Sequence, residues 1–187
     1  MSKSSFKPRD KATANLTARP NAADNFKIGG IYTVTCIDAD GNLKWVEEAH
    51  NLFTTAGIDH IMDIVFGTTA KDATLYVGLI DEGTPMAAAD TLASPTNWTE
   101  ATETATGSAN RQEWVNDAGG SSSGALGNGD SVASFTIDDT DIIGGAFLTN
   151  VETGTAGILY CVVEFTDRVV AAGDTLTVDY TITAADS

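Results

Sequence analysis

The strongest constraint on the fold is a strict two-residue alternation in residues 175–182. The apolar set consists of Leu176, Val178, Tyr180 and Ile182, and the polar set between them consists of Thr175, Thr177, Asp179 and Thr181. Successive side chains of a β-strand point to opposite faces, so this pattern predicts a strand with one buried and one exposed face. Such a strand is stable in a sheet whose apolar face is covered by another layer.

Shorter segments of the same character recur through most of the chain. We expect strands in residues 29–36, 43–50, 74–80, 98–104, 111–115, 132–137, 143–149, 159–165 and 175–182. Residues 74–80 are apolar in both alternating sets, which predicts a strand covered on both faces. This number of strands, separated by turn signals, is typical of a sandwich. The chain is therefore predicted to be mainly β, with a jelly-roll-like β-sandwich as a single domain over residues 28–187.

The connections between these strands carry their own signals. Residues 38–42, Asp-Ala-Asp-Gly-Asn, predict a tight turn that makes a hairpin of the first two strands. Residues 86–92 are expected to form one short helical turn within a long excursion. The Gly/Ser-rich residues 119–129 are expected to form a loop. Gly144 and Gly145 predict a bulge or a close approach of two backbones.

One segment follows a helical period instead. Its apolar stripe consists of Ile58, Ile61, Met62, Val65 and Phe66, its polar side consists of Asp59, His60 and Asp63, and Ile64 lies off the stripe. The spacing is that of one face of an α-helix. Thr54 or Thr55 can cap its start, and Gly67 lies where a glycine often ends a helix. We expect one amphipathic helix, lying on the strand of residues 74–80, with this stripe in the core.

Charge is distributed very unevenly along the chain, whose net charge is −16. Residues 1–27 contain six basic and two acidic side chains, a net charge of +4, and the remaining 160 residues contain four basic and 24 acidic ones, a net charge of −20. Residues 1–27 also lack any apolar period, which predicts an extended basic arm that does not fold alone. The acidic remainder should repel nucleic acid and anionic membranes, so we expect neither as a partner.

Motifs for catalysis or metal binding are weak. Residues 120–124 match Gly-x-Ser-x-Gly, but the catalytic version needs a strand before the serine and a helix after it, and neither is expected here. His50 and His60 are far apart in the predicted elements, which disfavours a metal site. Cys36 and Cys161 lie in apolar strand patterns and are expected to be buried free thiols. We therefore expect no enzymatic activity, no catalytic residues, no metal and no cofactor.

Acidic side chains leave two alternatives open. Asp138, Asp139 and Asp141 cluster between two predicted strands. The simpler interpretation is a solvated turn, and the alternative is a site that binds a calcium ion. A second set pairs acids with aromatic side chains, as sugar-binding sites do, and comprises Glu100, Glu103 and Glu113 with Trp98 and Trp114. The alternative interpretation of this second set is an exposed strand whose two tryptophans anchor the core.

A family resemblance runs through residues 50–187. The segments are "NLFTTAGIDHIMDIVFGTT", "ATLYVGLIDEG", "NWTEATE", "RQEW" and "IGGAFLTN". Their order resembles that of small structural proteins of tailed bacteriophages, which have a helix–strand pair, a Trp-Thr-Glu segment and a strand of this last type. The resemblance rests on packing residues and turns, without a catalytic signature. It implies a virion protein, and within that class a protein that decorates or cements the head.

The expected function follows from the resemblance together with the charge distribution. We expect a capsid decoration protein on the exterior of the virion, made in the host cytoplasm, with the major capsid protein as its partner and a dimer or trimer as its assembled form. The expected contact is the arm, with the basic side chains Lys3, Lys7, Arg9, Lys11, Arg19 and Lys27. The alternative is a tail or fibre-associated module for host recognition or glycan binding. An enzyme acting on polysaccharide ranks third.

Overall fold

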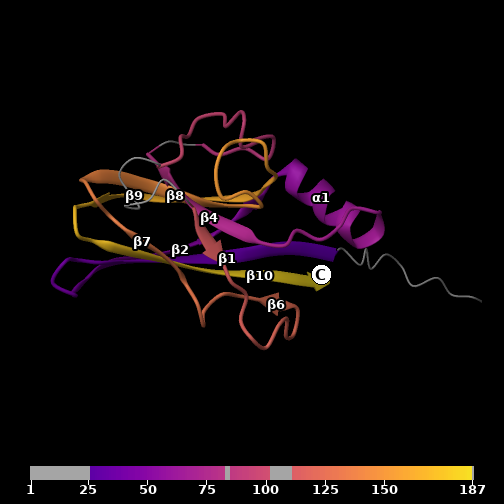
Figure 1. Cartoon of the computed structure of the whole chain (residues 1–187), viewed down its shortest axis with the longest axis horizontal. Coiled ribbons are helices and arrows are strands. Elements are labelled where there is room, and N and C mark those ends of the chain that lie inside the picture. Colours follow the sequence, from indigo (N-terminus) through magenta and orange to yellow (C-terminus); the bar gives the residue numbers. More distant parts are fainter. Residues whose placement is uncertain (1–25, 83–84, 102–110, 187) are drawn as a thin grey trace, which may run out of the picture.

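The computed structural model describes residues 26–82, 85–101 and 111–186. These residues form two antiparallel five-stranded sheets stacked on one another, with one helix (Figure 1). The first sheet has the order β2 (Leu43–His50), β1 (Phe26–Ile37), β10 (Thr175–Asp186) and β6 (Ala125–Leu126), and β7 (Ala133–Thr136) also pairs with β10. The second sheet has the order β3 (Leu52–Phe53), β9 (Leu159–Val170), β8 (Asp141–Thr149), β4 (Leu75–Asp81) and β5 (Gln112–Trp114). The predicted class, a mainly β sandwich with one helix, is confirmed.

The centre of the first sheet is the pairing of β1 with β10. The two strands run antiparallel over their whole lengths, from Phe26 opposite Asp186 to Ile37 opposite Thr175. The predicted alternation of β10 is confirmed, because Leu176, Val178 and Tyr180 are fully buried and the residues between them are partly exposed. At the middle of this pairing, the rings of Tyr32 and Tyr180 stack with their centroids 3.9 Å apart.

The core lies between the two sheets. Cys161 of β9 places its sulfur 3.4 Å from the Tyr32 hydroxyl and 3.3 Å from the Tyr180 hydroxyl, which joins the two layers. Cys36 and Cys161 are both buried free thiols, as predicted. Burial raises the pKa of the Cys161 thiol, even though its hydrogen bonds act in the opposite direction. A thiol held protonated in this way is a core side chain with little nucleophilic character.

Several predicted connections are confirmed and others are wrong. The hairpin turn at residues 38–42 is closed by the Asp38 amide, which donates to the Asn42 carbonyl at 2.8 Å, and the predicted bulge falls between Ile143 and Gly145. Residues 98–101 form no strand, only an isolated bridge from Ile80 to Glu100, and residues 102–104 lie outside the described residues. The loop predicted at residues 119–129 contains β6.

Residues 86–92 form turns rather than the predicted helical turn. The cause is Asp90, whose carboxylate accepts hydrogen bonds from the backbone amides of Ala87 and Thr96 and from the indole nitrogen of Trp98. An aspartate that bonds neighbouring amides offers the backbone an alternative to a helix. Burial alone would raise the pKa of Asp90, but a hydrogen bond from the Thr96 hydroxyl together with these three holds it below its usual value.

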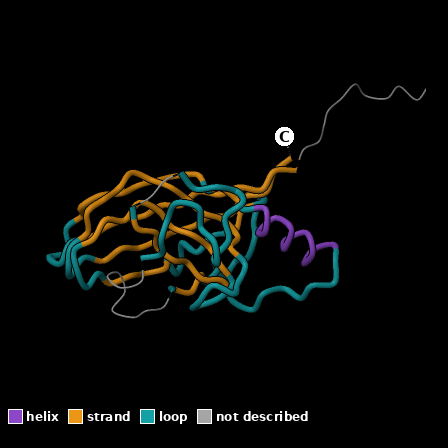
Figure 2. The backbone as a smooth tube through the Cα atoms, turned by 90° about the horizontal axis from the view of Figure 1, so that it is seen from above, coloured by secondary structure: helices purple, strands orange, loops and turns teal. Residues whose placement is uncertain are grey.

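The helix α1 (Thr55–Phe66) has the predicted ends. The Thr54 side chain accepts a hydrogen bond from the Gly57 amide at 2.9 Å, and Gly67 forms the C-cap. The first turn packs closely on β9, because a Cβ atom at Gly57 would lie 2.6 Å from the Cα atom of Tyr160. From there the helix extends beside one end of the sandwich (Figure 2). The prediction that it lies on the strand of residues 74–80 is wrong, since it packs mainly against β9.

The prediction that the helical stripe belongs to the core is also wrong. Four members of the stripe are exposed: Ile58 by 43%, Met62 by 49%, Val65 by 61% and Phe66 by 77%. The core between the sheets is already filled by strand side chains, so the helix finds room only at the end of the sandwich. Helical periodicity shows that a face is apolar, but it does not show that the same chain covers it.

Candidate functional site: the apolar end face

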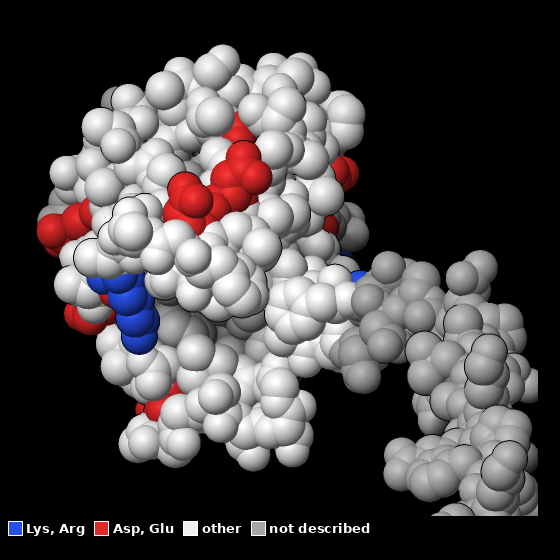
Figure 3. Space-filling model, turned by 90° about the vertical axis from the view of Figure 1, so that its right-hand side faces the viewer, with Lys and Arg blue, Asp and Glu red and all other residues white. Residues whose placement is uncertain are grey.

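An apolar surface lies at the end of the sandwich where the helix lies. We call it the end face, and it consists of Phe26 at the start of β1 and the four exposed side chains of the α1 stripe, Ile58, Met62, Val65 and Phe66. Phe26 is 72% exposed. Figure 3 looks at this end of the molecule, and most of the described surface in that view belongs to neither acidic nor basic residues. Large exposed patches of this kind mark interaction sites more often than chance.

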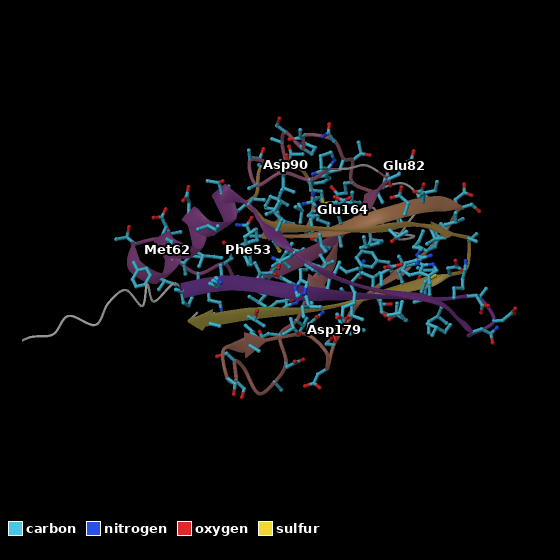
Figure 4. All side chains as sticks on the ribbon, turned by 180° about the vertical axis from the view of Figure 1, so that it is seen from behind. Phe53, Met62, Glu82, Asp90, Glu164 and Asp179 are labelled. Atoms are coloured by element: carbon cyan, nitrogen blue, oxygen red, sulfur yellow. The ribbon has the colours of Figure 1, made fainter. Side chains whose placement is uncertain are left out.

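Two hollows lie in the end face. One is a groove between β1 and α1, lined by Phe26, Lys27, Ile28, Ile58, Ile61 and Met62. Figure 4 shows Met62 on the outer part of the helix, with Phe53 further in toward the sheets. Since residue 26 joins the predicted arm to β1, the groove lies beside the point where the arm meets the body.

The other hollow is a pocket of about 380 Å³ between α1 and the ends of both sheets. Its wall is almost entirely apolar and includes Phe53, Leu148, Ile61, Ile64 and Val65, with Lys71 and Asp72 among the lining residues. Its volume is within the range of sites that bind small apolar groups. The sequence analysis placed Ile64 off the stripe, although its spacing from Ile61 already gave the signal for a second apolar side of the helix.

A polar cluster centred on Asp72 holds the helix against the body beside this pocket. The carboxylate accepts a hydrogen bond from the Tyr160 hydroxyl and one from Asn150 at 3.1 Å, and it lies 3.0 Å from Nε2 of His60 on α1. The rings of His60 and Tyr160 meet edge to face, 5.7 Å apart. His60, predicted to lie on the polar side of the helix, thus contacts the body. Burial alone would raise the pKa of Asp72, but the three hydrogen bonds together lower it.

Replacing Asp72 with asparagine should loosen this attachment. At neutral pH the free energy of unfolding should fall by about 1–3 kcal/mol, because hydrogen bonds to a charged carboxylate are lost. The pKa of Asp72 is lowered in the folded protein, so its contribution is complete above the usual pKa of about 3.9 and decreases as the pH falls through the lower, folded value. Urea unfolding measured at neutral pH and near pH 3 should therefore show a smaller difference between variant and parent at the acidic pH.

The matched control is Asp59→Asn, which removes an exposed carboxylate from α1 itself, the helix that the Asp72 cluster attaches. It should change stability by less than about 0.5 kcal/mol. Equal effects of the two substitutions would mean that helix charge, and not the Asp72 cluster, determines the stability difference.

Most of the predicted contact residues cannot be placed. Lys3, Lys7, Arg9, Lys11 and Arg19, and the extended arm as a structural feature, lie outside the described residues. Lys27 is described: it is exposed, lies on β1 opposite Ala185, and lines the groove of the end face. The one predicted contact that the structure places is thus next to an apolar surface whose helical residues the sequence analysis assigned to the core.

The acids and tryptophans proposed as a sugar site are arranged differently from such a site. Trp98 and Trp114 are only 5% and 7% exposed, and their indole nitrogens donate to Asp90 and to the Tyr180 carbonyl. Glu100 forms a two-point ion pair with Arg111, with both distances 2.6 Å, Glu113 lies exposed on β5, and Glu103 is outside the described residues. The tryptophans therefore anchor the core, and neither presents a ring on which a sugar could stack.

The remaining candidate motifs are explained by local structure. Residues 120–124 form a turn with positive φ angles at Gly120, Ser123 and Gly124, without the strand-to-helix geometry of a nucleophile. Asp139 and Asp141 each accept a hydrogen bond from the amide of the next residue. Among the residues that the structure describes, no group of three or more His, Cys, Asp or Glu side chains could hold a metal ion.

No family model, curated protein or solved structure matches this chain. The resemblance to phage head proteins stays a prediction for that reason. In the described parts of the chain, no helix is both long enough and apolar enough to span a membrane.

Proposed function

We propose that this protein is a bacteriophage head decoration protein that binds the exterior of the capsid without covalent bonds and stabilises the lattice of the major capsid protein. The observation that carries the proposal is the position of residue 26: the basic arm joins the body at an exposed apolar surface, next to Lys27. A basic segment and an apolar surface that meet at one end of the sandwich can contact the same partner. The resemblance of residues 50–187 to phage structural proteins supports this partner class.

The proposed mechanism uses many weak contacts. A net charge of +4 in residues 1–27 is attracted to an acidic shell, while the acidic remainder, with a net charge of −20, repels nucleic acid and anionic membranes. Assembly as a dimer or trimer repeats each contact by symmetry, and linked contacts bind more tightly than any single one. The protein would be made in the host cytoplasm and act on the virion exterior, with no cofactor and no enzymatic step.

Deleting residues 1–25 tests the role of the arm. The variant should lose binding to purified heads that lack the protein, with at least a tenfold weaker apparent affinity, because the linked basic contacts are removed. Its unfolding midpoint should stay unchanged, since β1 begins at Phe26. Binding is measured by co-sedimentation with heads, and folding by circular dichroism.

A second variant separates charge from chain length. Replacing Lys3, Lys7, Arg9 and Lys11 with glutamine keeps the arm but removes four charges. It should also weaken binding and reduce the dependence of binding on salt concentration. If the deletion variant still saturates heads, the arm is not the contact.

Copy number distinguishes the head from the tail. A head protein should be present in a simple ratio to the major capsid protein, and a tail or fibre module in a few copies per particle, as measured by quantitative mass spectrometry. The burial of Trp98 and Trp114 gives no support to the glycan-binding alternative. We therefore propose the head location.

A further inference from the structure

The end face exposes about as much apolar surface as the larger patches found on soluble monomers. Phe26 and Phe66 are 72% and 77% exposed, and a phenylalanine has about 150–250 Å² of surface. With Ile58, Met62 and Val65 added, the five side chains expose on the order of 500 Å², toward the upper end of the roughly 300–600 Å² of the largest patch on a typical monomer. A stable interface covers about 800 Å² on each partner, so these five side chains would supply more than half of one.

The end face contains both projecting side chains and a hollow that could receive them. Val65 and Phe66 project from the last turn of α1, and the pocket of about 380 Å³ begins beside them, with Val65 in its wall. An apolar cavity of about 150 Å³ is enough to hold benzene, so the pocket can accept an aromatic side chain. A surface that carries both parts is complementary to itself, which is the requirement for two copies to pair about a two-fold axis.

The charges of the end face also favour a second copy. Three basic side chains of the body, Lys44, Arg111 and Arg168, form ion pairs within the fold. Lys27 and Lys71 are the two basic side chains of the described residues without such an ion pair, and each lines one of the two hollows.

The acids that could meet these lysines lie on the same helix. Asp59 and Asp63 of α1 are exposed. Two unpaired lysines that line the hollows and two exposed aspartates on α1 offer complementary charge to an identical surface. A body with a net charge of −20 otherwise repels a second copy, so this is where approach is most favourable.

We propose that the end face is the surface at which two copies of this chain associate, with the last turn of α1 of each copy seated over the pocket of the other. Because the two-fold axis repeats the contact, each of these apolar side chains is buried twice, once in each copy. The arms of both copies then begin beside the same seam. The proposal identifies the contact surface of the oligomer that the proposed function includes. Only the biological role of the dimer rests on that function.

The test measures the assembly of the full chain without heads. Sedimentation velocity and light scattering between 1 and 100 µM should give twice the chain mass of 19.4 kDa. The double variant Met62→Asp with Phe66→Asp places charges in the centre of the interface and should give 19.4 kDa at every concentration, a loss of at least a hundredfold in dimer affinity. Its circular dichroism spectrum should match that of the parent, because both side chains are exposed on the single chain. Its unfolding midpoint should be independent of concentration, whereas that of a dimeric parent rises with concentration.

The matched controls are Leu43→Asp and Val169→Asp, which charge exposed apolar side chains of β2 and β9 outside the end face. Both should stay dimeric. A parent chain that is monomeric at 100 µM overturns the proposal, as does a dimer that survives the double variant, or a trimer. If the parent is monomeric and the double variant nevertheless loses head binding, the end face is a capsid contact instead. A monomeric double variant that still binds heads supports the proposal and leaves the head function intact.

Discussion

Replacing Gly57 with alanine is expected to separate the first turn of α1 from β9 and to lower the free energy of unfolding by about 2–4 kcal/mol. The new Cβ atom would lie 2.6 Å from the Cα atom of Tyr160 and closer still to its carbonyl oxygen. These are backbone atoms of a strand that pairs with β3 on one side and β8 on the other, so they cannot move aside. The helix has to move instead, which also breaks the hydrogen bond from the Gly57 amide to Thr54.

The measurement combines urea unfolding with hydrogen exchange of the α1 amides, which should become faster if the helix leaves the body. Gly119→Ala is the matched control, because a Cβ atom there meets no atom within 4 Å and the residue has no positive φ. That variant should stay within about 0.5 kcal/mol of the parent. An unchanged unfolding midpoint and unchanged exchange in the Gly57 variant would show that the helix is not held by this contact.

Replacing Phe147 with alanine should lower the free energy of unfolding by about 3–5 kcal/mol, because it removes a fully buried ring from the body. The ring packs against the indole of Trp98 at 5.6 Å and beneath the guanidinium of Arg111 at 5.1 Å. It also fills the space over Gly78, where a Cβ atom would overlap the ring. The substitution therefore leaves a cavity and removes a favourable contact of the buried Arg111.

Urea unfolding should be followed by tryptophan fluorescence and by circular dichroism, since Trp98 next to the cavity can change its emission without unfolding. Leu43→Ala serves as the control, because that side chain is 62% exposed on β2 and should contribute less than about 0.5 kcal/mol. A loss below about 1 kcal/mol for the Phe147 variant would mean that the surrounding strands close the cavity.

The strands and the ends of the helix could be predicted because their signals are local. The alternation around Tyr180, the turn at residues 38–42 and the cap at Thr54 each depend on neighbours in the chain. The short strand β6 could not be predicted in the same way. Its Leu126 pairs with Ile182, and nothing in the Gly/Ser-rich segment itself indicates that partner.

The position of the helix depends on information that periodicity does not contain. The stripe with Met62 and Phe66 looks the same in a sequence whether it faces a core, a partner or water. The contact of His60 with Asp72 joins two segments on either side of the helix end, and Tyr160 completes it from a strand 88 residues after Asp72. The end face was therefore missed as a site, although its four helical residues had been identified as apolar.

The pairing of β1 with β10 also has a consequence for how the chain is made. About 140 residues separate Ile37 from its partner Thr175, and β10 follows every other strand in the chain. At roughly 5–20 residues per second, the ribosome releases β1 on the order of 7–30 s before β10 is available. During that interval β10 does not yet cover Tyr32, Val34 and Cys36, which are fully buried in the folded protein. We expect chaperones to protect these side chains until then. A nascent chain arrested before residue 175 should therefore not form the centre of its first sheet, however long the arrest lasts.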